Sequence, residues 1–339
     1  MCNEVQNVGA IDFAHRGSKM TISTAFDIPL AESPCVGCGQ CAQACPTGAI
    51  VVKNDIAKVW KALDDRGTKV TVQIAPAVRV ALGRELGIAP GENAMGRIVA
   101  ALRRMGFDEI YDTSTSADLT VLEESNELAK RLGEGKAELP LFSSCCPAWV
   151  RYCETRYPEL MEHVSTCKSP MQMFAAVIRE NNRTSSRKCV HVVDMPFGTM
   201  TGAGVIFGVT GGVTEAVLRR LASDKSNTAL MSIAYTGVRG MEGVKEARVM
   251  VGEKEVRIGV VSGLKNASDL IERIKAGEHF DFVEVMACPG GCVSGGGQPF
   301  ASNMEREKRG AGLYSADKLC SIKRSEENPL MMSLYNGIL

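Results

Sequence analysis

The sequence predicts an α/β protein with largely parallel sheets, preceded by a small cysteine-rich domain. Beyond residue 69, short apolar runs typical of strands alternate with segments of helical periodicity, which is the pattern of parallel α/β folds. Residues 1–55 are instead dense in glycine and cysteine and show little helical periodicity. The chain has 339 residues, enough for about two domains of roughly 150 residues each.

The expected elements follow one another in a regular order. A charged stretch over residues 55–66 predicts a helix that links the two domains. Short apolar runs predict strands at 70–75, 109–112, 139–142, 189–193, 247–251, 256–261 and 280–287. Helical patterns predict helices over 94–105, 117–132, 170–179, 212–222 and 270–276, and the third begins with proline, which the first helical turn accepts.

The composition argues against several classes of partner. Hydrophobic residues make up 45% of the chain and the formal net charge is zero, which gives no electrostatic basis for binding nucleic acid or a membrane surface. No apolar run approaches the ~20 residues that a bilayer span needs, and the N-terminus lacks a signal-like apolar region. We therefore expect a cytoplasmic protein. In that setting, the 13 cysteines are better explained as metal ligands than as a disulfide framework.

One cysteine run near the N-terminus has the C-x2-C-x2-C-x3-C-P spacing of bacterial ferredoxins: Cys35-Val-Gly-Cys38-Gly-Gln-Cys41-Ala-Gln-Ala-Cys45-Pro46. It predicts an electron-transfer [4Fe–4S] cluster rather than a zinc site, because zinc usually takes two separated C-x2-C pairs. In ferredoxins the fourth cysteine of a run binds the other cluster, and Cys2 stands where the last cysteine of a preceding run would be. The favoured ligands are Cys35, Cys38, Cys41 and Cys2, and the rival set replaces Cys2 by Cys45.

A second cysteine site follows the apolar run 280–287. Cys288 and Cys292 lie four residues apart in a loop made mostly of glycine and small residues. Glycine lets the backbone approach a bulky group closely, and thiolates bind soft metals. The stretch therefore predicts a loop that wraps an inorganic cluster.

Two motifs resemble signatures of the [FeFe]-hydrogenase family. The segment Ser143-Ser-Cys-Cys-Pro-Ala-Trp149 is similar to the T-S-C-C-P-G-W type signature. Residues 284–299, which contain Cys288 and Cys292, are similar to the E-x-M-A-C-x2-G-C-x2-G-G-G-Q-P signature. Segments 168–172 and 201–212 also resemble the family, so that the similarity covers nearly the whole chain.

The resemblance implies an iron-hydrogenase-like catalytic domain preceded by a ferredoxin-like domain. The expected divisions are a truncated ferredoxin-like [4Fe–4S] domain over 1–55, a linker helix over 56–68, the large domain over 69–308 and a shortened small-subunit-like segment over 309–339.

The resemblance also implies a second [4Fe–4S] cluster in the large domain. Cys146 and Cys288 would bind it, Cys292 would bridge it to a diiron centre, and Cys145 would be a proton-transfer thiol. Adjacent residues of extended chain point in opposite directions, which allows Cys145 and Cys146 different roles. The residues implied in cofactor contact are Met286, Ser169 and Pro170.

A proton path from Cys145 to solvent is implied as well, through Glu124, Ser165, Glu127 and Arg131. At about 100° per residue, Glu124, Glu127 and Arg131 share one face of the expected helix. The other face is apolar and comprises Val121, Leu122, Leu128, Ala129 and Leu132. The alternative is a solvated face with an ordinary Glu127–Arg131 pair.

One family signature, of the M-P-C-x2-K type, is missing. It is expected after the strand at 189–193, where the sequence reads Asp194-Met-Pro-Phe-Gly198. The fourth cysteine ligand and a lysine that contacts a diiron ligand are therefore lost, and a diiron centre is in doubt. The fourth ligand stays open between Cys189, Cys153, Cys167, a non-cysteine ligand, an open iron and a ligand from another subunit. Inert burial is the simpler interpretation of each of these cysteines, and Cys320 is expected in the core.

Two functions are compatible with this pattern. The first is an [FeFe]-hydrogenase-like oxidoreductase that reduces protons, oxidises H2 or carries out a related reduction, fed by the N-terminal cluster and a partner such as ferredoxin. The second is a non-catalytic iron–sulfur protein without a diiron centre: an electron relay, a redox or H2 sensor, or a relative of the cluster-assembly branch. A partner subunit that completes the cluster site is a third interpretation.

Overall fold

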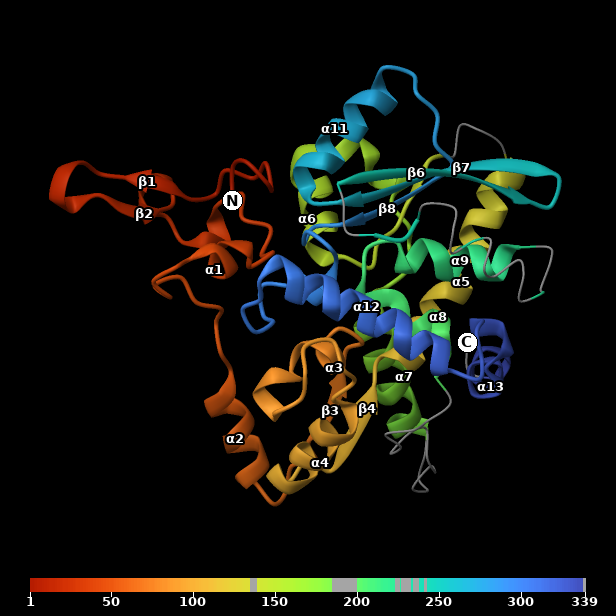
Figure 1. The fold of residues 1–339 in the computed structure, drawn as a ribbon, viewed down its shortest axis with the longest axis horizontal. Helices are drawn as coiled ribbons and strands as arrows, with labels where there is room; N and C mark the ends of the chain where they lie inside the picture. The colour runs from red at the N-terminus through yellow and green to blue at the C-terminus, as the bar shows by residue number, and fades with distance from the viewer. Residues whose placement is uncertain are drawn as a thin grey trace.

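The computed structural model describes residues 1–134, 139–184, 200–222, 226, 233, 238–240 and 243–337. The larger part of the molecule contains a four-stranded sheet in the order β5-β8-β7-β6 (Figure 1). The strands are Leu141–Phe142 (β5), Phe282–Met286 (β8), Lys254–Ser262 (β7) and Val244–Val251 (β6). β5, β8 and β7 run parallel, while β6 is antiparallel to β7 because a two-residue turn joins them, with Gly252 at φ 62°.

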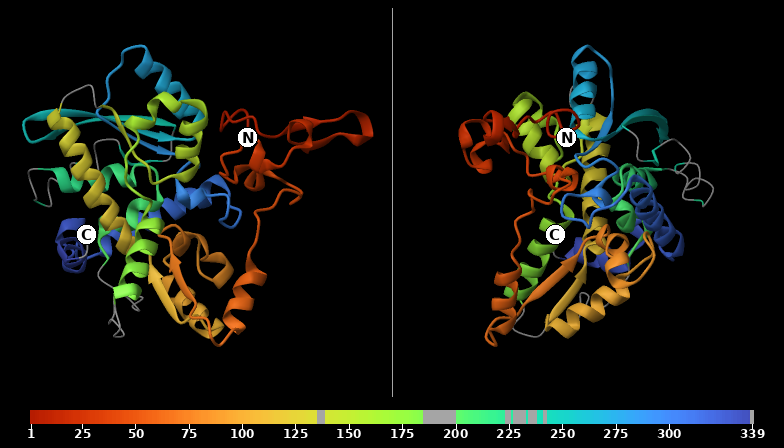
Figure 2. Two further views of the ribbon diagram at one scale, coloured as in Figure 1. Left: turned by 180° about the vertical axis from the view of Figure 1, so that it is seen from behind. Right: turned by 60° about the vertical axis from the view of Figure 1, so that its left-hand side comes forward.

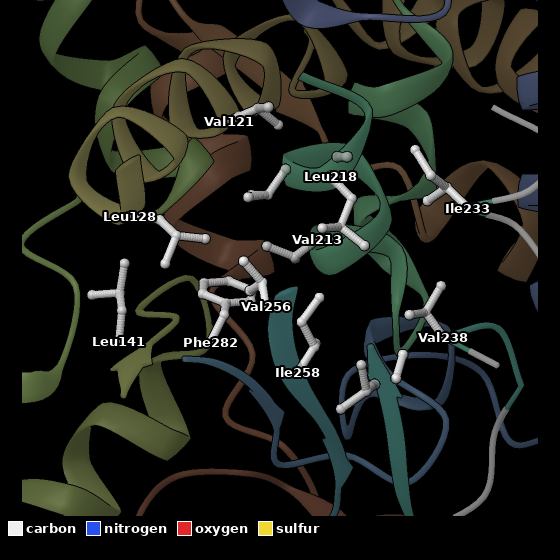
Figure 3. Close-up of a cluster of buried hydrophobic side chains, with 14 of the residues drawn as sticks. Val121, Leu128, Leu141, Val213, Leu218, Ile233, Val238, Val256, Ile258 and Phe282 are labelled. Atoms are coloured by element: carbon white, nitrogen blue, oxygen red, sulfur yellow. The ribbon is translucent and has the colours of Figure 1, made fainter. Parts of the chain in front are cut away.

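Helices cover both faces of this sheet. α5 (Ser114–Glu134) and α9 (Gly212–Leu221) pack on one face, and α6 (Pro147–Arg156) and α11 (Leu264–Lys275) pack on the other. Along β8, Phe282 and Met286 enter the first cluster, and Val283 and Val285 enter the second. Burial on both faces explains why apolar residues occupy consecutive positions of this strand and do not alternate with polar ones. Figure 3 shows the first cluster, in which Val121, Val213 and Phe282 come from three different elements.

A second, smaller unit is formed by β3 (Thr71–Ile74), α4 (Met95–Met105) and β4 (Glu109–Asp112). The two strands are parallel and the helix connects them, as in a βαβ unit. Ile74, Ile98 and Ile110 share its core. The predicted α/β class with largely parallel sheets is confirmed in both units.

The C-terminal region adds helices that the sequence pattern did not reveal. α12 (Asn303–Leu319) begins at a capping box formed by Ser302 and Glu305 and contacts α8 (Gly202–Val205) and α3 (Val78–Ala81). α13 (Pro329–Gly337) packs on α5, as does α7 (Pro170–Thr184), which is the helix expected over 170–179. The division expected at residues 308 and 309 falls inside α12.

The N-terminal region contains little regular structure. Its hairpin of β1 (Asp12–Ala14) and β2 (Thr21–Ser23) projects away from the body (Figures 1 and 2). α1 (Gln40–Ala44) lies inside the cysteine run, and α2 (Ile56–Asp64) is the helix expected after it. Short 3₁₀ helices occupy Gly17–Lys19, Ala25–Asp27, Leu30–Glu32, Arg84–Leu86, Pro158–His163, Ile206–Gly208, Cys292–Ser294 and Ser325–Glu327.

The strand expected at 189–193 lies outside the described residues. Ala129, expected on the apolar face of its helix, is exposed. α5 begins at Ser114 rather than residue 117, because its first turns are buried through polar partners that periodicity cannot detect. Among the described helices, none combines the length and apolarity needed to cross a membrane.

Phe282 offers a test of the sheet core. Its side chain is 1% exposed, whereas that of Phe300 is 65% exposed. We expect Phe282→Ala to lower the free energy of unfolding by about 3–5 kcal/mol, because it leaves a cavity between the sheet and α5. Phe300→Ala should change it by less than about 0.5 kcal/mol. Urea unfolding of both variants measures this, and equal losses would contradict the assignment of the core.

Candidate functional site

The parallel pairing of β5 and β8 brings two cysteine motifs to one edge of the sheet. Phe142 is in register with Val283, so the residues that follow each strand emerge side by side. The Ala287 backbone N–H donates to Cys146 Sγ at 3.5 Å, and Cys288 is the next residue. The carboxyl edge of a parallel sheet is the usual place for a ligand site.

The loop after β8 carries the third thiol and depends on glycine. Gly290 and Gly291 take φ values of 85° and 95°, which disfavour a side chain. A Cβ on Gly291 would lie 2.7 Å from the backbone nitrogen of Thr210, so the chain has no room for a larger residue. Cys292 follows as the exposed first residue of a 3₁₀ turn whose other two residues are buried. The loop therefore carries Cys292 close to Cys288.

The three thiols Cys146, Cys288 and Cys292 influence one another electrostatically. Burial raises the pKa of Cys288 well above its usual range, and neighbouring Cys292, Cys146 and Cys38 raise it further. Burial likewise raises the pKa of Cys146. Thiols that resist deprotonation without a cation suit a site whose positive charge comes from bound iron.

Unpartnered polar atoms next to these thiols indicate the same kind of site. Gln40 Oε1, Thr210 Oγ1 and Ser294 Oγ are buried and have no hydrogen-bond partner among the described residues. In the described part of the chain, no three His, Cys, Asp or Glu side chains converge as ligands of a single metal ion do. Thiols around a cubane lie further apart than ligands of one ion, so the donor set fits an iron–sulfur cluster better than a zinc ion.

No described cysteine takes the place of the fourth ligand. Cys153 Sγ is fully buried and faces the Tyr157 carbonyl at 3.6 Å, and Cys320 is buried against Ala316, as expected of core thiols. Cys167 lies by the carboxylates of α5 instead. Cys189 and the segment 194–198 lie outside the described residues.

The N-terminal thiols form a separate group. Burial raises the pKa of Cys38 to about 11, and Cys41, Cys35 and Cys2 each raise it as neighbouring charges. Cys2 Sγ also accepts from the Ala10 backbone N–H at 3.3 Å, which fixes it beside the run. This arrangement favours Cys2 as the fourth member of the set.

Cys45, the last cysteine of the run, has different surroundings from the other N-terminal thiols. A hydrogen bond to the Thr47 hydroxyl, with the sulfur and oxygen 3.5 Å apart, and backbone amides lower its pKa to about 7. Its thiol lines a surface cavity of about 630 Å³ that Cys2 and Cys41 also border. Cys45 therefore faces this cavity, and it is not among the main causes that raise the pKa of Cys38 or Cys41.

The groups of the expected proton path are linked in space. The Ser144 N–H donates to Glu124 Oε1 at 3.3 Å, which holds Glu124 beside Cys145. Ser165 Oγ donates to Glu127 Oε2 at 2.9 Å and is close enough to Glu124 to act against the rise in the pKa of that carboxyl. Ser165 reaches α5 because its chain runs parallel to β5, where its N–H donates to the Phe142 carbonyl at 2.7 Å.

The outer end of this arrangement reaches the surface. Arg131 Nη2 donates to Glu127 Oε1 at 2.7 Å, so the ordinary i,i+4 pair is present. Both residues line a cavity of about 440 Å³ that opens at the surface. The alternative of a fully solvated face is wrong, because Glu124 on the same side of the helix is 0% exposed.

Glu124 is the group most altered by its environment. Burial raises its pKa to about 8, although Ser144 and Ser165 oppose the shift. Its Oε2 is buried and has no hydrogen-bond partner among the described residues. Burial also raises the pKa of Cys145 well above its usual value, with the charge of Glu124 as the next cause. Both groups therefore hold a proton near neutral pH.

The three residues implied in cofactor contact lie in different surroundings. Ser169 Oγ accepts from the Gln172 N–H at 3.4 Å and lines a cavity of about 460 Å³ with Ser144 and Ser165. Pro170 is the first residue of α7. Met286 is buried in the cluster against which Cys145 packs.

Sequence reasoning gave no role to Glu284, which the structure makes central. Its buried carboxylate accepts from the N–H groups of Gly211 and Thr214, each at 2.7 Å, and so caps the start of α9. This contact ties β8 to the loop that supports Gly291. A carboxylate inside an apolar strand is the signal that could have identified it.

Comparison with known proteins places these features in a family. The model described as iron only hydrogenase large subunit, C-terminal domain, matches residues 68–196 and 192–296. A 4Fe-4S binding domain matches residues 29–51, and an iron hydrogenase small subunit matches residues 303–339. The chain belongs to the iron-only, or [FeFe], hydrogenase family. It is an iron–sulfur oxidoreductase of this type with a [4Fe–4S] site in its N-terminal part.

Individual relatives and a solved structure support this family assignment. The NADP-reducing hydrogenase subunit HndD of Solidesulfovibrio fructosivorans is 39% identical over the whole chain and 69% of its own length. Iron hydrogenase 1 of Clostridium pasteurianum is 33% identical over 86% of this chain, which spans only 62% of that relative. Cytosolic iron-sulfur assembly component 3 of Bos taurus is 23% identical over 89% of this chain and 78% of its own length. The structure of apo HydA1 from Chlamydomonas reinhardtii has a TM-score of 0.65 at 32% identity, covering 84% of this chain and 94% of that one.

Paired substitutions separate Cys2 from Cys45 as ligand. We expect Cys2→Ala to remove most of the EPR signal of the reduced N-terminal cluster, because Cys2 groups with the other three thiols. Cys45→Ala should retain the signal and the iron content. The reverse result would assign the fourth position to Cys45.

The raised pKa of Glu124 predicts a dependence of stability on pH. In the unfolded chain Glu124 releases its proton above the ordinary carboxyl pKa of 4.5, whereas the folded chain keeps this proton up to about pH 8. The stability that the protonated carboxyl contributes is therefore lost as the pH rises from about 4.5 towards about 8. Glu124→Gln lacks this pH dependence, because its side-chain amide has no proton to release in this range. The free energy of unfolding of the wild type relative to Glu124→Gln should therefore fall across this range, as measured by urea unfolding at several pH values. A constant difference would contradict the raised pKa.

Proposed function

We propose that this chain is a hydrogenase-type enzyme that reduces protons or oxidises H2, using electrons exchanged through its N-terminal cluster. The observation that carries the proposal is the series of proton-holding groups from Cys145 through Glu124, Ser165 and Glu127 to Arg131 at the surface. An electron relay has no need of such a series, whereas hydrogen chemistry consumes or releases a proton with each electron.

The residues of the chain divide the work between electrons and protons. Cys146, Cys288 and Cys292 would hold the second cluster, and a group bound there would supply the redox chemistry. Cys145 holds a proton at its Sγ, and the unpartnered Oε2 of buried Glu124 is the next site that accepts it.

Ser165 passes the proton outward, because its hydroxyl can both donate and accept, it donates to Glu127, and it influences the pKa of Glu124. Arg131 pairs with Glu127 and holds its carboxylate at the edge of the surface cavity, where the path meets solvent. The direction of transfer is set by the supply of electrons.

We infer that electrons arrive from a separate redox protein such as ferredoxin, or from a partner subunit. The relative HndD is, by name, a subunit of a larger hydrogenase, which supports the second source. A cytoplasmic location is proposed because all of the described cysteines are free of disulfides.

The lost signature supports a second candidate, a non-catalytic iron–sulfur protein. The described residues supply only three thiols to the large-domain site, and the chain is also similar to a cytosolic iron–sulfur assembly component. Infrared spectroscopy decides between the two functions. Protein produced together with the hydrogenase maturation machinery should show CO and CN stretching bands. Cubane signals in EPR without these bands would favour the second candidate.

Glu124 and its neighbour Glu123 form a matched pair for testing the proton path. We expect Glu124→Gln to lower H2 turnover by about 10²–10⁴-fold, since the amide cannot carry the proton. Glu123→Gln should keep turnover within about twofold, because Glu123 lies outside the linked series and lines the surface cavity. Gas-chromatographic H2 assays of the two variants measure this. Similar losses in both would mean that the charge of α5, and not the path, matters.

A further inference from the structure

We propose that Gln6 is a positioning residue of the large-domain cluster site, whose side-chain amide holds the start of the loop 287–298. Gln40 holds the end of the same loop, which carries Cys288 and Cys292. The inference rests on the second cluster of the proposed function but not on hydrogen turnover or a diiron centre.

Gln6 belongs to the N-terminal segment, yet it is buried against the large domain. It is 1% exposed. Val8, two residues further on, packs in one hydrophobic cluster with Val285 and Ala287. A polar side chain in such surroundings needs hydrogen-bond partners there, because water cannot supply them.

The amide of Gln6 is hydrogen-bonded at both ends. Its Nε2 donates to the Ala287 carbonyl at 2.8 Å, between residues 281 apart in sequence. Its Oε1 accepts from the N–H of Leu264, the first residue of α11, at 3.4 Å. Ala287 in turn donates its N–H to Cys146 Sγ and directly precedes Cys288. Gln6 therefore holds the residue that links two thiols of the site.

Gln40 holds the same loop beyond its second thiol. It is 0% exposed, and its Nε2 donates to the Ser294 carbonyl at 2.9 Å. Ser294 belongs to the same 3₁₀ turn as Cys292. A Cβ on neighbouring Gly39 would lie 3.0 Å from the Gly296 Cα, so α1 and the loop meet backbone to backbone. In Figure 1, α1 lies beside the loop that precedes α12. The two amides thus bond to the loop on either side of its thiols.

The middle of the loop is supported by the large domain itself. The Gly290 N–H donates to Ser262 Oγ at 2.8 Å, and the Gly290 carbonyl accepts from the Thr210 N–H at 3.3 Å. The large domain therefore fixes the middle of the loop, and the N-terminal region fixes its two ends.

The chemical consequence is firmer binding of the large-domain cluster. A residue that orients a metal ligand typically contributes about 10–100-fold to metal affinity. Gln6 does so through Ala287, and no bond is formed and no proton moves at the amide. The part of the chain that holds the electron-transfer cluster thus also shapes the second cluster site.

The N-terminal cluster serves as the internal reference. The turn around Cys2 is closed by its own backbone, since the Gln6 N–H donates to the Met1 carbonyl at 3.1 Å and the Val8 N–H to the Cys2 carbonyl at 3.0 Å. Substituting the side chain of Gln6 leaves these bonds in place. The effect on the large-domain cluster can therefore be separated from any effect on the N-terminal one.

Asn7, the next residue, provides the matched control. Its Nδ2 donates to Tyr152 Oη at 3.2 Å and to Ser268 Oγ at 3.3 Å, which ties the same turn to α6 and α11. Asn7 takes a φ of 50°, which glycine adopts readily. Asn7→Gly therefore removes two hydrogen bonds of this turn and keeps the contact with Ala287.

The test is chelator-driven iron loss from the anaerobically reconstituted full chain, followed by EPR of the two reduced clusters. We expect Gln6→Met to release the iron of the large-domain cluster at least about tenfold faster than the wild type and to change the EPR line shape of that cluster. Methionine fills similar space but has no amide. Gln40→Met should act in the same direction. The N-terminal cluster should keep its wild-type rate in both variants, and Asn7→Gly should leave both rates unchanged.

Large-domain iron loss at the wild-type rate in Gln6→Met would overturn the proposal, as would an equal acceleration for both clusters or in Asn7→Gly. If Gln6→Met does not fold, Gln40→Met decides by the same criteria, because it acts on the same loop. A wild-type chain that holds only the N-terminal cluster would overturn it as well. Missing CO and CN bands would count against hydrogen turnover alone, so the two failures are distinguishable.

Discussion

The parallel pairing of β5 with β8 is the contact on which the site depends. It places Cys146 against Ala287, and so Cys146 and Cys288 share one edge of the sheet although they lie far apart in the chain. Slipping the register by one residue would turn β8 over and move Phe282 and Met286 out of their core. The packing of both faces therefore fixes the position of the thiols.

Buried carboxylates then attach the surrounding elements to this edge. Glu284 caps α9 from within β8, and Glu124 meets the chain between β5 and Cys145 from α5. Asp118 joins the same helix to Thr201, Ser325 and Asn328, which holds the C-terminal region against it. Each is buried and hydrogen-bonded, as the cost of removing a polar group from water requires.

Much of the fold could be predicted from the sequence, because local periodicity and strand composition decide where helices and strands lie. The strand 109–112 was predicted with its observed ends, and the helix predicted over 94–105 differs from α4 (Met95–Met105) by one residue. The buried polar start of α5 could not be predicted, since the partner of Asp118 at Asn328 is 210 residues away. The thiols followed from motif spacing, but Gln40 and Glu284 depend on long-range contacts that spacing does not contain.

We infer that this edge of the sheet holds an iron–sulfur cluster beside the N-terminal one. Mössbauer spectroscopy with iron and sulfide determination on the anaerobic protein tests it most directly. We expect two cubane clusters, with about eight irons per chain before any iron of a diiron centre is counted, and the loss of one cluster in Cys288→Ala. A single cluster that survives this substitution would contradict it.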